Sequence, residues 1–121
     1  MLDKIIGCKL TKITKEEIIV WKDNKKYRLQ IEDNEGDCCG YNEINTLLLI
    51  DENHHPIITD ITYKHTEDYG DGDLLEITFY GDNKQLALLT SYSTSGSGWG
   101  YGACVKVKCK ALKIDNTLTQ W

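Results

Sequence analysis

The sequence predicts a mainly β domain, with a β-rich α+β fold as the alternative. Apolar and polar side chains alternate with a period of two in several stretches, and short turn sequences separate neighbouring stretches of this kind. We expect about six or seven strands, arranged as a single antiparallel sheet, a small barrel or a sandwich, with at most one short helix.

Two strand–turn–strand units are the strongest local signals. The first spans residues 17–31 and has Asp23 and Asn24 at its turn, and the second spans residues 73–90 with Gly81-Asp82-Asn83-Lys84 at its turn. The strands on both sides are rich in β-branched, aromatic and leucine side chains. Because Asp and Asn tolerate the positive φ of a tight turn, both units are predicted to be antiparallel hairpins.

Three further strands are expected, at residues 5–10, 57–63 and 105–111. In the last of these, small or apolar side chains at the odd positions alternate with Lys106, Lys108 and Lys110. An extended chain puts these two sets on opposite faces, so one face of this strand is predicted to be buried and the other solvated. Residues 41–50 can form either a short helix or a strand.

Length and charge set the broad class of the protein. The chain has 121 residues, the usual size of one domain, so residues 1–121 are predicted to form a single domain. Fourteen basic and nineteen acidic side chains give a net charge of −5, which disfavours duplex nucleic acid and membranes as partners. The sequence lacks a long apolar run and a signal peptide, so we expect a cytoplasmic location and reduced cysteines.

A loop rich in serine, glycine and aromatic residues, at positions 91–102, is the most informative stretch. Its glycines let the backbone adopt positive φ and approach a ligand, and successive N–H groups in such a loop can bind an anion. Trp99 and Tyr101 would add rings for stacking or for contact with a partner. The alternative is a bulged connection whose two rings close one end of the core. The four glycines are Gly96, Gly98, Gly100 and Gly102.

A second unusual stretch contains Asp37 and the adjacent cysteines Cys38 and Cys39. Thiolates with the downstream pair His54 and His55 could in principle bind zinc, but adjacent residues of an extended chain point to opposite faces and no Cys-x-x-Cys pair is present. No base lies at a spacing that indicates a catalytic thiol. The sequence therefore predicts no metal site, no cofactor and no catalytic residue.

Acidic side chains crowd the segment at residues 67–73. Asp68, Asp71 and Asp73 fall at irregular intervals before a strand, which does not match the ligand order of a calcium-binding loop. We interpret this segment as a solvated acidic turn that can steer a partner of complementary charge.

The order of these elements carries a resemblance. The Asp37-Cys38-Cys39 stretch after an N-terminal hairpin, followed much later by a strand, a Ser/Thr-rich Gly-aromatic-Gly loop and a strand, resembles a family of small bacteriophage proteins of uncharacterised domain type. The resemblance implies a non-enzymatic inhibitor that contacts a bacterial antiviral defence protein, such as a nucleotide-consuming effector, in the host bacterial cytoplasm. The predicted partner-binding residues are Trp99, Tyr101, Asp68, Tyr69, Asp71, Asp73 and Tyr92. The predicted structural or ligand loops contain Asp37, Cys38, Cys39, Gly96, Gly98, Gly100 and Gly102.

Two other functions follow from the same residues. One is a sponge that sequesters a nucleotide signalling molecule through the Gly-rich loop and a neighbouring lysine. The other is an enzyme that uses Asp37, Cys38 or Cys39 with a histidine, a hypothesis that the spacing of these residues does not favour.

Overall fold

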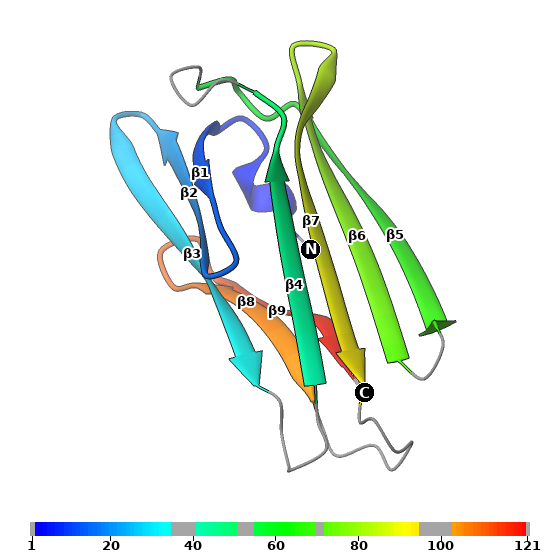
Figure 1. Cartoon of the computed structure of the whole chain (residues 1–121). Helices are drawn as coiled ribbons and strands as arrows, with labels where there is room; N and C mark the ends of the chain where they lie inside the picture. The colour runs from blue at the N-terminus through cyan, green and yellow to red at the C-terminus, as the bar shows by residue number, and fades with distance from the viewer. Residues whose placement is uncertain (1, 35–40, 51–54, 70–71, 95–102, 121) are drawn as a thin grey trace.

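The computed structural model describes residues 2–34, 41–50, 55–69, 72–94 and 103–120, with the backbone alone for residues 67–69. In these residues, nine strands form two antiparallel sheets that face each other as a sandwich (Figure 1). One 3-10 helix precedes the first strand. The predicted mainly β fold is confirmed. The elements are η1 (Asp3–Ile5), β1 (Lys9–Ile13), β2 (Glu17–Lys22), β3 (Lys25–Asn34), β4 (Tyr41–Leu48), β5 (Asp60–Tyr69), β6 (Gly72–Gly81), β7 (Lys84–Thr94), β8 (Cys104–Cys109) and β9 (Ile114–Gln120).

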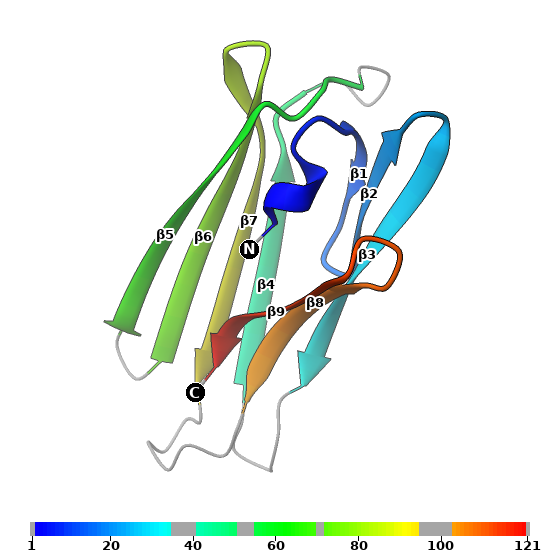
Figure 2. The same ribbon diagram turned by 180° about the vertical axis from the view of Figure 1, so that it is seen from behind.

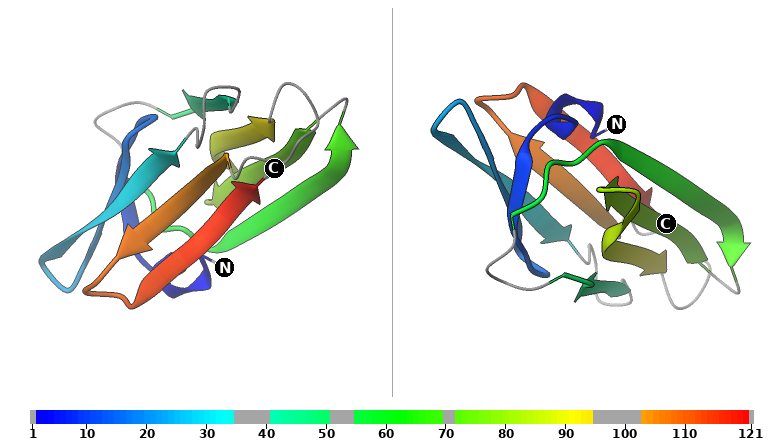
Figure 3. Two further views of the ribbon diagram at one scale, coloured as in Figure 1. Left: turned by 90° about the horizontal axis from the view of Figure 1, so that it is seen from below. Right: turned by 90° about the horizontal axis from the view of Figure 1, so that it is seen from above.

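The two sheets contain different numbers of strands, and sheet A combines strands from both ends of the chain. Sheet A has the order β1-β2-β3-β8-β9 and sheet B has the order β4-β7-β6-β5. The chain passes from sheet A to sheet B after β3 and returns after β7, as seen from both sides in Figures 1 and 2. Figure 3, viewed along the strands, shows the two layers and the segment between β4 and β5 that runs over one end of the sandwich.

Both predicted hairpin turns are confirmed. Asp23 and Asn24 have φ of 53° and 63°, and Asp82 and Asn83 have φ of 50° and 60°. Lys22 pairs with Lys25 around the first turn, so two residues make the connection. Two residues with positive φ give the turn a twist that matches the right-handed twist of the flanking strands.

The strand predicted at residues 5–10 is wrong in its first half. Residues Asp3–Ile5 form η1, and β1 begins only at Lys9, after Gly7 with φ of 96°. The β-branched pair Ile5-Ile6 favours an extended chain, but the turn places Leu2 and Ile5 between the two sheets, where both are fully buried. Burial of these side chains outweighs the local preference.

The other strand predictions differ mainly in their ends and their number. The strand predicted at residues 57–63 begins at Asp60, and the ambiguous residues 41–50 contain strand β4. Val105 and Val107 are buried and alternate with half-buried lysines, as predicted, whereas Ala111 is exposed in the turn before β9. The sequence analysis missed β9, because its polar residues do not show a clean alternation.

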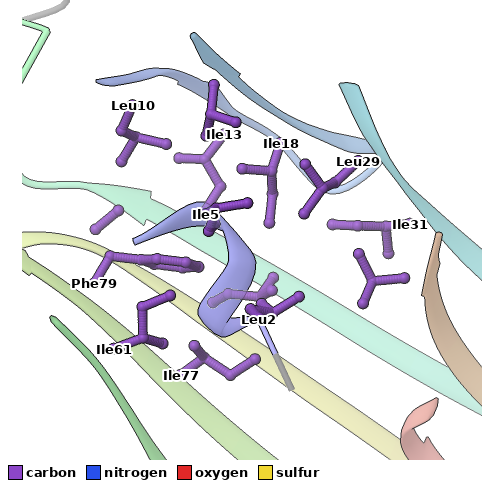
Figure 4. Close-up of a cluster of buried hydrophobic side chains, with 14 of the residues drawn as sticks. Leu2, Ile5, Leu10, Ile13, Ile18, Leu29, Ile31, Ile61, Ile77 and Phe79 are labelled. Atoms are coloured by element: carbon purple, nitrogen blue, oxygen red, sulfur yellow. The ribbon is translucent and has the colours of Figure 1, made fainter. Parts of the chain in front are cut away.

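An apolar core lies between the two sheets. Leu2 and Ile5 of the N-terminal turn face Phe79 of sheet B and residues of sheet A, as Figure 4 shows. The backbone joins this turn to the segment before β5: the Gly7 N–H donates to the Ile58 carbonyl at 2.8 Å, and the Ile58 N–H donates to the Cys8 carbonyl at 2.9 Å. The N-terminal turn is therefore part of the core.

Tyr63 of β5 fixes the start of the chain. Its hydroxyl oxygen accepts a hydrogen bond from the Leu2 backbone N–H at 2.9 Å. Burial raises the pKa of Tyr63 above its ordinary value, although the Leu2 N–H acts in the opposite direction. Since the phenolate is disfavoured in the folded protein, this side chain stabilises the fold most when it is protonated.

Truncation of the N-terminal turn is expected to be costly. Ile5→Ala should lower the free energy of unfolding by about 2–5 kcal/mol, because it leaves a cavity between the sheets. Leu47, which is 53% exposed on sheet B, is the matched control, and Leu47→Ala should change the value by less than about 0.5 kcal/mol. Urea unfolding of both variants measures the difference, and equal losses would contradict the placement of Ile5.

The alkaline limit of stability should depend on Tyr63. Tyr63→Phe removes the acceptor of the Leu2 N–H and should cost about 1 kcal/mol near neutral pH. The contribution of Tyr63 is complete below the unfolded-state pKa of about 10 and is lost as the pH rises through the raised pKa of the folded state. In urea unfolding, the difference in the free energy of unfolding between wild type and Tyr63→Phe should therefore shrink as the pH rises above the unfolded-state pKa. Tyr41→Phe, at an exposed position, should give no such narrowing.

Candidate functional site

The strand ends that flank three segments singled out by the sequence analysis lie at one end of the sandwich. Asn34 at the end of β3 pairs with Cys104 at the start of β8, and Thr94 at the end of β7 lies between Tyr41 and Gly72. These strand ends flank residues 35–40, 70–71 and 95–102, as the lower part of Figure 1 shows. We call this the loop end. The turns at Asp23-Asn24 and Asp82-Asn83 lie at the opposite end, which we call the hairpin end.

Most of the predicted site residues lie outside the described residues. These are Asp37, Cys38, Cys39, Asp71, Gly96, Gly98, Trp99, Gly100, Tyr101 and Gly102. Asp68 and Tyr69 belong to β5 by their backbone, and their side chains are likewise not described. Asp73 and Tyr92 are described, and both lie close to the loop end.

Asp73 joins three strands across the edge of the sandwich. Its Oδ1 contacts Nε2 of His65 on β5, and its Oδ2 accepts a hydrogen bond from the Gln120 backbone N–H of β9 at 3.1 Å. Its side chain is only 13% exposed. Both carboxylate oxygens therefore have structural partners, and a contact between Asp73 and a target stays a prediction.

Tyr92 lies on the outer face of sheet B, between Glu43 of β4 and Leu74 of β6. Its ring covers Gly72, because a Cβ at that position would come within 2.6 Å of the ring atom Cε2. A shallow hollow of about 520 Å³ adjoins it, lined by Glu43, Asn45, Leu74, Glu76, Thr90 and Tyr92. Tyr92 thus combines a packing role with access to an acidic surface.

Buried polar side chains join the apolar core near the loop end. Ser91 and Ser93 of β7 each place Oγ 2.7 Å from Oγ1 of Thr119 on β9, which links the two sheets. The three hydroxyl groups are fully or almost fully buried. Hydrogen bonds are directional, so this cluster fixes the relative position of β7 and β9 more closely than apolar packing alone.

Asn42 of β4 makes a second link between the sheets. Its Nδ2 donates to Oδ1 of Asp33 at 2.7 Å, to the Asn34 carbonyl at 2.9 Å and to the Cys104 carbonyl at 3.0 Å. Asn34 and Cys104 are the strand ends that flank residues 35–40 and 95–102. The Asn42 amide therefore holds the ends of both loops. Its own Oδ1 is buried and has no hydrogen-bond partner in the described structure.

The described cysteines are free thiols. Cys8 and Cys109 are buried and Cys104 is half-buried. Burial raises the pKa of the Cys8 thiol, which keeps the thiol protonated and unreactive. No cluster of three His, Cys, Asp or Glu side chains suitable for a metal ion occurs within the described ranges, which do not include Cys38 and Cys39.

Comparisons with family models, curated proteins and solved structures return no match for this chain. The resemblance to small bacteriophage proteins therefore stays a prediction. Among the described residues, no helix is long and apolar enough to cross a membrane.

The sequence analysis missed the polar base of the loop end. Ser91 and Ser93 are two residues apart on β7, which is the spacing of residues that face inward on a strand. Asn42 is likewise two residues from the inward-facing Ile44 on β4. This alternation was a usable signal. The partners, however, come from β3, β8 and β9, and their identity depends on how the sheets pair.

The Asn42 link gives a direct test of the loop end. Asn42→Asp places a carboxylate against three acceptors and should lower the free energy of unfolding by more than about 2 kcal/mol. Asn45→Asp is the matched control, because Asn45 is on the same strand but faces solvent, where its amide contacts Glu43 at 3.2 Å. We expect that change to stay near 0.5 kcal/mol in urea unfolding. Similar losses for the two variants would rule out the inter-sheet role of Asn42.

Proposed function

We propose that this domain is a non-enzymatic binding protein whose loop end contacts a target protein. The observation that carries the proposal is the convergence of the strand ends around Asn34, Tyr41, Gly72, Thr94 and Cys104 above a buried, hydrogen-bonded base. Loops held by a rigid scaffold are the usual place for binding residues, and the ends of a β-sandwich present such loops together.

The composition of the three segments suits a protein interface. Residues 95–102 contribute Trp99 and Tyr101, and aromatic side chains supply much of the binding energy at interfaces. Asp68 and Asp71 belong to the acidic turn at residues 67–73 and would surround these rings with negative charge. The half-buried Tyr92 would extend this aromatic surface onto sheet B.

The charge of the sheet B half indicates the kind of target surface. Residues 41–94 contain ten acidic and two basic side chains, a net charge of −8. A target with a basic patch would be attracted over a distance of about 10 Å at 0.1 M salt, and the rate of association would fall as the salt concentration rises. The sequence resemblance to phage proteins supports a bacterial antiviral defence protein, such as a nucleotide-consuming effector, as this target.

The nucleotide-sponge function remains the alternative for the Gly-rich loop. The two functions differ in what the protein binds, because a sponge retains a small molecule in stoichiometric amount and needs no protein partner. Denaturation of purified protein followed by mass spectrometry of the released molecules separates the two functions.

A matched pair of tryptophan variants tests the proposed interface. Tagged protein is used to capture its target from a bacterial lysate, and the affinity for the purified target is then measured for each variant. Trp99→Ala at the loop end should weaken binding by about 2 kcal/mol or more, and Trp21→Ala at the hairpin end should leave it unchanged. If Trp99→Ala binds as tightly as wild type, or if both variants lose affinity equally, the loop end is not the interface.

A further inference from the structure

The two halves of the sandwich carry opposite charge. Residues 2–34 and 104–120, which build sheet A and the N-terminal turn, contain twelve basic and seven acidic side chains, a net charge of +5. The sheet B half has the net charge of −8 given above, so the overall negative charge of the chain conceals a basic face. The field of sheet A attracts anions even though the whole molecule is acidic.

Ion pairs offset part of the positive charge in the middle of this basic face. Lys12 and Arg28 both pair with Glu17, and Lys108 pairs with Glu32 at 3.2 Å. The hydrogen bond from Arg28, followed by that from Lys12, lowers the pKa of Glu17, so this carboxylate stays charged and holds its partners. In the described structure, no carboxylate pairs with Lys9, Lys22 or Lys26. Three ammonium groups at the hairpin end are therefore available to a ligand, and among the described residues Lys106 and Lys110 likewise have no carboxylate partner.

An exposed tryptophan lies at the centre of these lysines. Trp21 of β2 pairs with Lys9 of β1 on one side and with Lys26 of β3 on the other. Directly opposed residues have Cβ atoms about 5 Å apart, so both ammonium groups can reach a ligand that covers the indole ring. Trp21 is 38% exposed, and the cation–π contact found in the described residues joins Lys25 to Tyr27, not to Trp21.

A pocket of about 740 Å³ opens beside Trp21. This volume lies within the range of about 300–1,000 Å³ that is typical of small-molecule sites. Ile57, which pairs with Lys9, is 48% exposed and adds an apolar wall. The remaining lining residues include Lys22, Asn24 and the Asp23 carboxylate, which offers an acceptor for an amino or hydroxyl group.

We propose that the row Lys9–Trp21–Lys26 and the adjoining pocket bind a nucleotide, with its base stacked on Trp21 and its phosphate held by the lysines. An aromatic ring flanked by unpaired ammonium groups is the combination that recognises a base joined to a phosphate. The same chemistry is offered by a free nucleotide and by one unit of a single-stranded nucleic acid. This site lies at the opposite end of the sandwich from the proposed protein interface and does not depend on it.

Nuclear magnetic resonance of the ¹⁵N-labelled full chain tests the site directly. The probes are inorganic phosphate, adenosine mono- and triphosphate, and an oligothymidylate of eight nucleotides, each titrated at low and high salt. We expect saturable shifts of the Trp21 indole N–H and of the Lys9 and Lys26 amides with the nucleotide probes. Tighter binding of the oligonucleotide identifies a single strand as the ligand, and equal or tighter binding of the mononucleotides identifies a free nucleotide.

Variants separate stacking from general attraction of anions. Trp21→Ala should weaken binding at least about tenfold, while Trp21→Phe should retain most of the affinity. Binding by Trp21→Phe would also show that the hairpin still folds when this residue is replaced. Lys9→Gln should weaken binding several-fold and reduce its dependence on salt. Lys64→Gln, on strand β5 of sheet B, is the matched control and should have no effect.

Three results would overturn the proposal. The first is the absence of shifts at Trp21 with every nucleotide probe. The second is a response to inorganic phosphate that equals the response to the nucleotides, which indicates an anion site without base recognition. The third is an equal loss of affinity in Lys9→Gln and Lys64→Gln, which indicates unspecific attraction.

Discussion

Leu2 and Ile5 fill the space between the two sheets, and the other features of the fold depend on this packing. The N-terminal turn packs against Phe79 between the sheets, and its backbone is joined to Ile58 and Tyr63. The segment between β4 and β5 must cross from one edge of sheet B to the other, and its hydrogen bonds to residues 7–10 hold it over the hairpin end. The connections that follow β3, β5 and β7 leave the sandwich at the opposite end.

The contact between the sheets changes in chemistry along the strands. Apolar side chains at the hairpin end stabilise the fold through burial and set no precise register. Hydroxyl and amide groups at the loop end form directional bonds, from Thr119 to two serines and from Asn42 to three acceptors. A polar base of this kind positions the strand ends from which the loops leave, and this fixed geometry suits a surface that binds another molecule.

The segregation of charge separates the two proposed sites. The sheet B half is acidic, whereas Lys9 and Lys26 of sheet A flank Trp21 at the hairpin end. Because exposed charges are screened over about 10 Å at 0.1 M salt, a ligand at one end responds mainly to the charges of that end. One small domain can therefore attract a basic protein surface and an anionic ligand at the same time.

The sequence alone determined the features that depend on neighbouring residues. The alternation around Val105 and Val107 and the Asp-Asn turns predicted strands, faces and hairpins correctly, because these preferences act within a few residues. The sequence also pointed to Tyr92 and Asp73 as candidate binding residues. It did not predict that the ring of Tyr92 covers Gly72 or that Asp73 contacts β5 and β9. The tertiary structure decided the turn at Ile5, the sandwich, the position of the strand ends that flank residues 35–40, 70–71 and 95–102 at one end, and the row Lys9–Trp21–Lys26 beside its pocket. Pairs such as Asn34 with Cys104 and the inter-sheet bonds of Asn42 join distant parts of the chain, and no local pattern specifies which strands will meet.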